Sequence, residues 1–147
     1  MEHFFYGLSQ AFEYIGGVPC ISKSDNMKQW VKRTDRYEPS FSDAAMEWSL
    51  YYETELDAVR PGKPRDKGPV ESVVNKFYLY VYTRLRNEVF YSLSGLNNRI
   101  YLLTDEYNYN EMKKRGYSRM ELFEAEERSA LKLLPATSFR FKYRKAF

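Results

Sequence analysis

The sequence predicts an α/β domain that is predominantly helical and contains two short strands. Apolar residues recur at intervals of three and four in several stretches, which is the spacing of one helix face. Residues 18–24 and 55–59 are short, lie between turn-forming residues and are interpreted as strands. The 147 residues are enough to bury a core, and 44% hydrophobic with 29% charged residues is typical of a globular protein.

The N-terminal segment, residues 1–14, has the pattern of an amphipathic helix. The Gly16–Gly17 pair follows it and is expected to stop it. The strand over residues 18–24 comes next and ends just before Asp25, and a helix is expected from Asn26. The apolar helix face consists of Phe4, Leu8, Phe12 and Ile15.

The next part of the chain predicts a loop, a helix and the second strand. Residues 34–40 have the composition of a loop, and Ser42 fits the N-cap of a helix over residues 43–52. The strand over residues 55–59 follows. Residues 60–69 (RPGKPRDKGP) contain three prolines and two glycines, so we expect a loop there.

The second half is expected to be helical up to a final strand. A long helix is expected from Pro69, with Glu71 in its first turn and a buried face of Val70, Val74, Phe77, Val81 and Leu85. Another helix fits residues 96–109. A capping box at Ser118 predicts a helix to about Leu131, and residues 138–147 alternate apolar and basic like an edge strand.

Composition excludes several kinds of site. Cys20 is the only cysteine and His3 the only histidine, which excludes an internal disulfide and a Cys/His zinc cluster. A hydrolase triad would have to use His3 at the fray-prone N-terminus. No stretch reaches 18 apolar residues and no signal-peptide pattern is present, so we expect a cytoplasmic location without membrane contact.

The net charge of +3 conceals three basic stretches. Residues 23–36 carry five Lys or Arg against two acids, residues 60–86 carry seven against two, and residues 137–147 carry four against none. Clustered positive charge is typical of a surface that binds a polyanion, although an unevenly charged solvated surface has the same composition. Two of these stretches each surround one carboxylate of interest, Asp25 and Glu71.

Asp25 and Glu71 are the candidate catalytic and metal-binding residues. Mg²⁺ prefers oxygen ligands, and enzymes that transfer phosphoryl groups with two metal ions hold those ions by carboxylates on rigid elements. Neighbouring Lys and Arg would offset the phosphate charge. Ordinary structural roles also fit, with Asp25 as a helix N-cap and Glu71 as a carboxylate that stabilises the helix dipole.

Four segments, in order, resemble the IstA-like insertion-sequence transposases. They are AFEYIGGVPCISKSDNMKQWV at residues 11–31, RYEP at 36–39, RPGKPRDKGPVESVV at 60–74 and SRMELFEAEERSALKLLP at 118–135. The resemblance implies an RNase H-like fold, the integrase catalytic core, for residues 1–90. It also implies a helical C-terminal extension over residues 91–147, leading to a β-barrel that this chain lacks.

The resemblance makes Asp25 the second and Glu71 the third acid of a DDE triad that holds Mg²⁺ or Mn²⁺. Residues 1–24 contain no aspartate, so the first acid and the first strands of the core are expected to be missing. DNA-binding roles are implied for the basic residues near the two acids. These are Lys28, Lys63, Arg65 and Lys67.

The expected function is therefore that of a fragment of a DNA transposase, a polynucleotidyl transferase acting on DNA ends, and inactive alone. The implied partners are transposon-end and target DNA, a homo-oligomer and an accessory ATPase of the IstB type. Two alternatives stay open. One is a non-catalytic DNA-binding remnant that uses basic residues such as Arg84 and Arg86 on phosphates, and the other is a helical protein-interaction module rich in tyrosine, of which the chain has 14.

Overall fold

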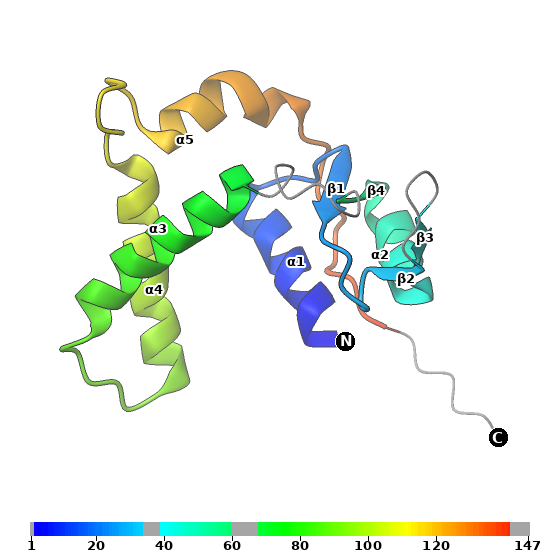
Figure 1. Cartoon of the computed structure of the whole chain (residues 1–147), viewed down its shortest axis with the longest axis horizontal. Coiled ribbons are helices and arrows are strands. Elements are labelled where there is room, and N and C mark those ends of the chain that lie inside the picture. The colour runs from blue at the N-terminus through cyan, green and yellow to red at the C-terminus, as the bar shows by residue number, and fades with distance from the viewer. Residues whose placement is uncertain (1, 34–38, 60–67, 142–147) are drawn as a thin grey trace. The chain divides into compact units, whose positions relative to one another are not determined.

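The computed structural model describes residues 2–33, 39–59 and 68–141 (Figure 1). The chain divides into two compact units. Unit 1 comprises residues 1–63 and 130–147, and unit 2 comprises residues 64–129. The boundary predicted at residue 90 was based on the resemblance to a protein family and not on which residues pack together. It stays a prediction.

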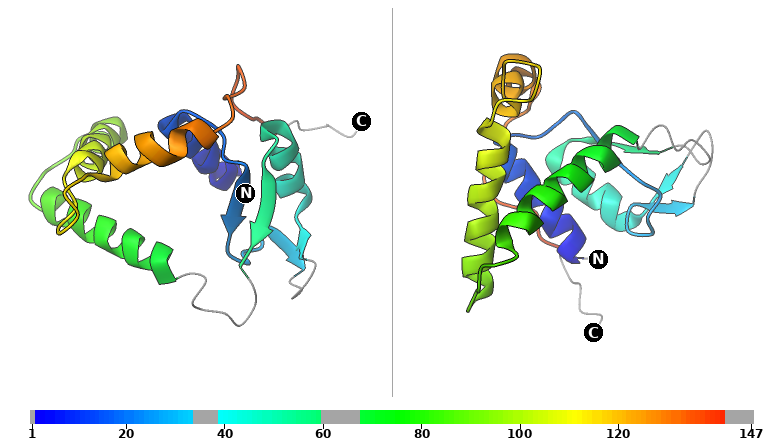
Figure 2. Two further views of the ribbon diagram at one scale, coloured as in Figure 1. Left: turned by 90° about the horizontal axis from the view of Figure 1, so that it is seen from above. Right: turned by 60° about the vertical axis from the view of Figure 1, so that its left-hand side comes forward.

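Unit 1 begins with helix α1 (Glu2–Ile15) and contains a parallel pair of strands, β1 (Ile21–Ser24) and β4 (Glu55–Ala58). Figure 2 shows the two arrows side by side and pointing the same way. Between them in sequence come the antiparallel strands β2 (Val31–Arg33) and β3 (Ser40–Phe41), followed by helix α2 (Asp43–Tyr52). The α/β prediction is confirmed in its coarse form: the chain is mostly helical, with short strands.

Aromatic side chains form the core of unit 1. The ring of Phe12 on α1 lies 5.1 Å from that of Trp48 and 5.2 Å from that of Tyr52, both on α2. Trp30, at the end of the turn before β2, lies 6.0 Å from Trp48. Ser9 satisfies the buried indole, because its hydroxyl accepts a hydrogen bond from Trp48 Nε1 at 3.1 Å. Such rings bury much apolar area in a small unit.

Helix α1 ends at the two glycines, as the sequence predicted. Gly16 has φ +76°, the left-handed conformation favoured at a helix C-terminus, and its N–H donates to the Phe12 carbonyl. Gly17 then passes close to the returning chain, and Val18 forms an antiparallel bridge with Lys132. This bridge joins the two sequence stretches of unit 1.

Unit 2 consists of helices α3 (Gly68–Leu85), α4 (Leu93–Tyr109) and α5 (Arg119–Leu122). After α5 the chain continues as a π-helical turn over Phe123–Glu127 and a 3-10 turn over Arg128–Ala130, so the predicted helix from Ser118 is present in mixed form. Ser118 and Glu121 make the expected capping box. Within the described residues, no helix combines the length and apolar character that a membrane crossing requires.

Several expectations about elements were wrong. No helix begins at Asn26: a turn leads to β2, because Trp30 is buried in the core and anchors the chain there. Residues 138–141 are not a strand, because Phe139 and Phe141 pack against the unit 1 core instead. The α3 face is not buried throughout: Val70 and Val74 are 65% and 57% exposed.

Candidate metal and nucleic-acid site

Asp25 lies directly after β1, as the sequence predicted. The structure places it at the carboxyl end of the parallel β1–β4 pair, which the sequence did not predict. Its Oδ1 atom is almost completely shielded from solvent. The neighbouring backbone is fixed by the strand that pairs with β1. Val59 donates its N–H to the Ser24 carbonyl at 3.0 Å, and the Asn26 side-chain amide donates to the Val59 carbonyl at 2.8 Å. Asp25 therefore lies between two residues that are hydrogen-bonded to Val59.

The nearest acid on β4, Asp57, is already engaged. Its Oδ2 forms an ion pair with Lys23 Nζ at 2.8 Å, and its Oδ1 accepts the N–H of Ala58 at 2.8 Å. The Asp57 carbonyl also accepts a hydrogen bond from Trp30 Nε1 at 2.9 Å. Asp57 thus contributes to the structure of the edge, and its negative charge is offset by Lys23.

Lys28 is exposed on the turn that follows Asp25. The N–H groups of Trp30 and Val31 both donate to the Met27 carbonyl at 2.9 Å, so the turn is tightly closed. The buried Trp30 ring anchors it. This geometry presents a cation three residues from the candidate metal ligand.

Glu71 lies in the first turn of α3 and is exposed. It belongs to unit 2, whereas Asp25 belongs to unit 1, and each acid is located on its own unit. Lys63, Arg65 and Lys67 lie outside the described residues. Their roles stay predictions.

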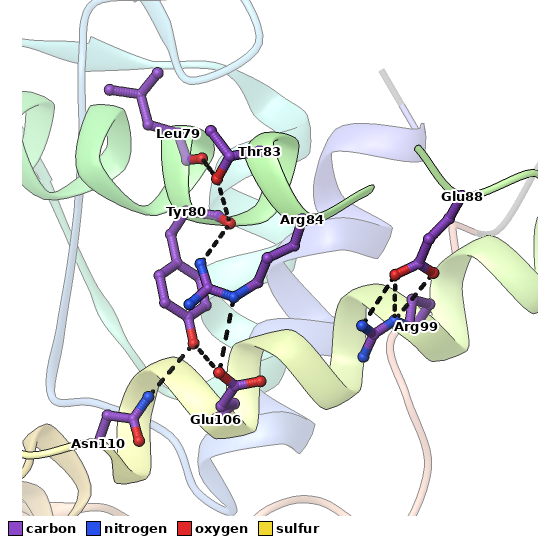
Figure 3. A network of polar contacts seen from close by, with 8 residues as sticks. All are labelled: Leu79, Tyr80, Thr83, Arg84, Glu88, Arg99, Glu106 and Asn110. Carbon is purple, nitrogen blue, oxygen red and sulfur yellow. Dashed lines mark hydrogen bonds and ion pairs between the residues drawn. The ribbon is translucent and has the colours of Figure 1, made fainter. Parts of the chain in front are cut away.

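Arg84, one of the cations considered for phosphate binding, is instead used within unit 2 (Figure 3). Its guanidinium lies 3.4 Å from the centre of the Tyr80 ring and 3.7 Å from Glu106 on α4. The Tyr80 hydroxyl donates to Glu106 at 2.5 Å. Partial burial, and then this hydrogen bond to a carboxylate, raise the pKa of Tyr80. No sequence signal marked this network, because it depends on how α3 and α4 cross.

The donor chemistry of Asp25 and Glu71 fits a hard divalent cation, since both supply carboxylate oxygens. Within residues 2–33, 39–59 and 68–141, however, no three His, Cys, Asp or Glu side chains gather as a metal-binding group. The basic and acidic residues that do meet, such as Lys23 with Asp57, neutralise each other. The assignment of Asp25 and Glu71 to a metal site therefore stays a prediction.

Comparison with known proteins identifies relatives along nearly the whole chain. It is 38% identical over 135 residues to a transposase named y4bL/y4kJ/y4tB of Sinorhizobium fredii, which covers 92% of this chain and 26% of the relative. It is 36% identical over 139 residues to a protein named as a transposase for insertion sequence IS408 of Burkholderia multivorans, and the match covers 95% of this chain and 27% of the relative. It is 27% identical over 146 residues to the transposase of IS21 of Pseudomonas aeruginosa, and the match covers 97% of this chain and 36% of the relative.

No protein-family model matches the chain. The chain spans only about a quarter to a third of the length of these curated relatives. The matched region nevertheless includes both candidate acids and the basic stretch between β4 and α3, since the alignments cover more than nine-tenths of the chain. By sequence, the chain is related to the insertion-sequence transposases and matches one segment of them.

Proposed function

We propose that this chain contributes part of the RNase H-like catalytic core of a DDE transposase. The observation that carries the proposal is the position of Asp25, half-buried with its Oδ1 atom shielded, at the carboxyl end of a parallel strand pair. Ligands bind at this end of the strands in open α/β sheets. Glu71 follows in the first turn of α3, the next helix after β4. The relatedness to insertion-sequence transposases supports DNA as the substrate.

In the proposed reaction, Asp25 and Glu71 act as the second and third carboxylates of the triad. A bound Mg²⁺ or Mn²⁺ would activate the attacking oxygen and stabilise the leaving oxygen at a DNA phosphate. Lys28 and the cations of the loop before α3 would hold the DNA backbone by charge. Those loop cations are Lys63, Arg65 and Lys67.

The proposal treats this chain as inactive alone, because two carboxylates leave a divalent ion incompletely held. The remaining acid would come from another segment of a whole transposase. A homo-oligomer and an accessory ATPase of the IstB type are proposed as partners of that whole protein. DNA cleavage or joining by the purified chain with Mg²⁺ or Mn²⁺ would contradict this part of the proposal.

Metal binding tests the site directly. Mn²⁺ titration followed by electron paramagnetic resonance should show weak binding, with a Kd of about 1 mM or higher, because two carboxylates supply far fewer oxygen ligands than the six to eight of a calcium site, and even some complete calcium sites bind with a Kd of about 10⁻⁴–10⁻³ M. Asp25→Asn and Glu71→Gln should each reduce the bound fraction. The matched control is Asp43→Asn, because the side chain of Asp43 is 92% exposed at the start of α2 and should not take part.

Equal Mn²⁺ binding by Asp25→Asn and Asp43→Asn would contradict the metal site. If the chain binds DNA, and neither Mn²⁺ nor the Asp25→Asn substitution changes its DNA affinity, the second candidate is favoured, a non-catalytic DNA-binding function. The exposed Lys28 and the basic stretch over residues 60–86 are the observations that favour this second candidate.

A further inference from the structure

One face of α3 combines the candidate acid with two tyrosines. Glu71, Asn75, Tyr78 and Tyr82 are separated by four, three and four residues, the spacing that places side chains on one helix face. All four are exposed. With a rise of about 1.5 Å per residue, Tyr78 lies about 10 Å along the helix from Glu71.

The rings of Tyr78 and Tyr82 stack on each other. Their centroids are 5.7 Å apart and their planes differ by 12°, while the two residues stay 61% and 56% exposed. Among the aromatic rings of the described residues, each of these two contacts only the other. The pair therefore presents parallel aromatic surface to solvent.

Tyr80, between them in sequence, shows what a tyrosine with a structural role does in this helix. Its ring is covered by the Arg84 guanidinium and lies 5.0 Å from Tyr107 of α4, and its hydroxyl is bonded to Glu106 (Figure 3). Tyr78 and Tyr82 point away from this contact, because a helix turns by about 200° over two residues. Packing of α3 on α4 thus does not explain them.

The same face ends in a cation. Arg86 follows Tyr82 by four residues, and its N–H donates to the Tyr82 carbonyl at 3.1 Å, so the backbone there is still helical. Arg86 is exposed. Residues 60–86 carry seven basic against two acidic residues. Four of these seven directly precede α3 in sequence: Arg60, Lys63, Arg65 and Lys67. Together with Arg86 on the face itself, they favour a polyanion over an apolar protein surface as the occupant of the face.

We propose that Tyr78 and Tyr82 form a stacking platform for unpaired bases of a DNA end, with Arg86 on a backbone phosphate. Aromatic side chains stack on bases without regard to sequence, and only unpaired bases expose their faces to them. At the duplex spacing of about 3.4 Å per nucleotide, the 10 Å from Glu71 to Tyr78 correspond to about three stacked nucleotides from the reacting phosphate, and to fewer nucleotides of an extended single strand. This inference rests on the proposed function, which places the phosphate at Glu71.

The test compares two DNA ends by fluorescence anisotropy with the full chain. One is a blunt duplex, and the other is the same duplex with a three-nucleotide single-stranded overhang. Wild-type protein should bind the overhang more tightly. The double variant Tyr78→Leu/Tyr82→Leu should lose about tenfold in affinity for the overhang and keep its affinity for the blunt duplex.

Two further variants separate stacking from folding. Tyr78→Phe/Tyr82→Phe keeps the rings and should retain the preference, whereas leucine is apolar and favours helix but cannot stack. Tyr91→Leu is the matched control, because Tyr91 is 97% exposed and lies beyond the end of α3. It should bind like wild type. Helical content by circular dichroism should be equal in all of them.

An overhang preference that persists in the leucine variant overturns the platform. Binding of both DNA ends without a preference also overturns it, while the Mn²⁺ titration judges the proposed function independently. A change in self-association of the leucine variant, measured by sedimentation with unchanged DNA affinity, would show that the face binds a second copy instead. If the chain binds neither DNA end, and Asp25→Asn binds Mn²⁺ as well as wild type does, both proposals fail.

Discussion

Gly16 and Gly17 are each required for a different structural reason. Gly16 needs a left-handed backbone, and Gly17 needs space. A Cβ on Gly17 would lie 2.7 Å from the Cβ of Leu131 and 3.0 Å from the Lys132 carbonyl oxygen. The sequence alone suggested that both glycines simply stop a helix. The second glycine in fact permits the C-terminal stretch to approach.

We therefore expect Gly17→Ala to destabilise unit 1 by about 1–3 kcal/mol, the usual cost of overpacking a tight contact. Urea denaturation followed by tryptophan fluorescence measures it, because Trp30 and Trp48 lie in that core. The matched control is Gly7→Ala in the middle of α1, where an added Cβ meets nothing within 4 Å. Helix propensity should make that control more stable by up to about 1 kcal/mol. Equal effects at the two positions would contradict the contact.

At the candidate site, the positions of Asp25 and Glu71 within their elements followed from the sequence. Each is set by local signals: a short strand before Asp25, and a proline-rich loop and helix start before Glu71. The contacts around these two acids could not be predicted from the sequence. The bonds of Asn26 to Val59 and of Lys23 to Asp57 depend on which strands pair, and nothing local specifies that β1 lies parallel to β4.

Elements with local caps were predicted closely, while their burial was not. Ser42 accepts the N–H of Ala45 and begins α2 at the expected residue. Helix α4 has a serine N-cap too, Ser92, but the prediction did not use it and placed the start of this helix at residue 96 instead of Leu93. The apolar pattern of α3 predicted a buried face, but Val70 and Val74 stay exposed. Periodicity marks a face that can be buried, whereas burial requires a partner element on that side.

The contact between α3 and α4 should depend on pH through Tyr80. The pKa of Tyr80 is raised above its ordinary value of 10.0 by partial burial and by the Glu106 carboxylate, which opposes a second negative charge. A raised pKa in the folded state means that the stabilisation is fully present below pH 10 and is lost as the pH rises through the raised value. The positive charge of Arg84, whose guanidinium lies over the Tyr80 ring, lowers this pKa and so offsets part of the shift.

Circular dichroism across an alkaline titration checks this expectation. Wild-type protein should lose helical signal above pH 10 more steeply than Tyr80→Phe, which has no hydroxyl to ionise. Tyr80→Phe should in turn be slightly less stable at neutral pH, because it gives up the bond to Glu106. Superimposable titrations of the two proteins would show that Tyr80 does not link the helices.

At the scale of the whole chain, the distribution of charge can be read directly from the sequence. Basic residues are concentrated in three stretches, and Lys28 in the first of them is exposed. Electrostatic binding to DNA releases counterions, so the affinity should fall linearly with salt on a logarithmic scale. Each phosphate contact contributes about 0.9 to that slope for duplex DNA.

We expect Lys28→Gln to reduce the slope of duplex binding by about one contact. The matched control is Lys113→Gln, because Lys113 is also exposed and lies in the turn after α4; it should leave the slope unchanged. Anisotropy measured over a range of salt concentrations gives both values. Identical slopes for wild type and Lys28→Gln would remove Lys28 from the DNA contacts while leaving the remaining cations as candidates.

Unit 1 is built from two stretches of sequence that are far apart. The Val18–Lys132 bridge, the bond from the Tyr51 hydroxyl to the Thr137 carbonyl and the packing of Phe5 on Phe141 join them. A protease that nicks the chain anywhere within residues 68–129 would therefore leave two fragments still associated. They would travel as one species on a native gel and separate only when denatured, so a cleaved product could be mistaken for the intact protein.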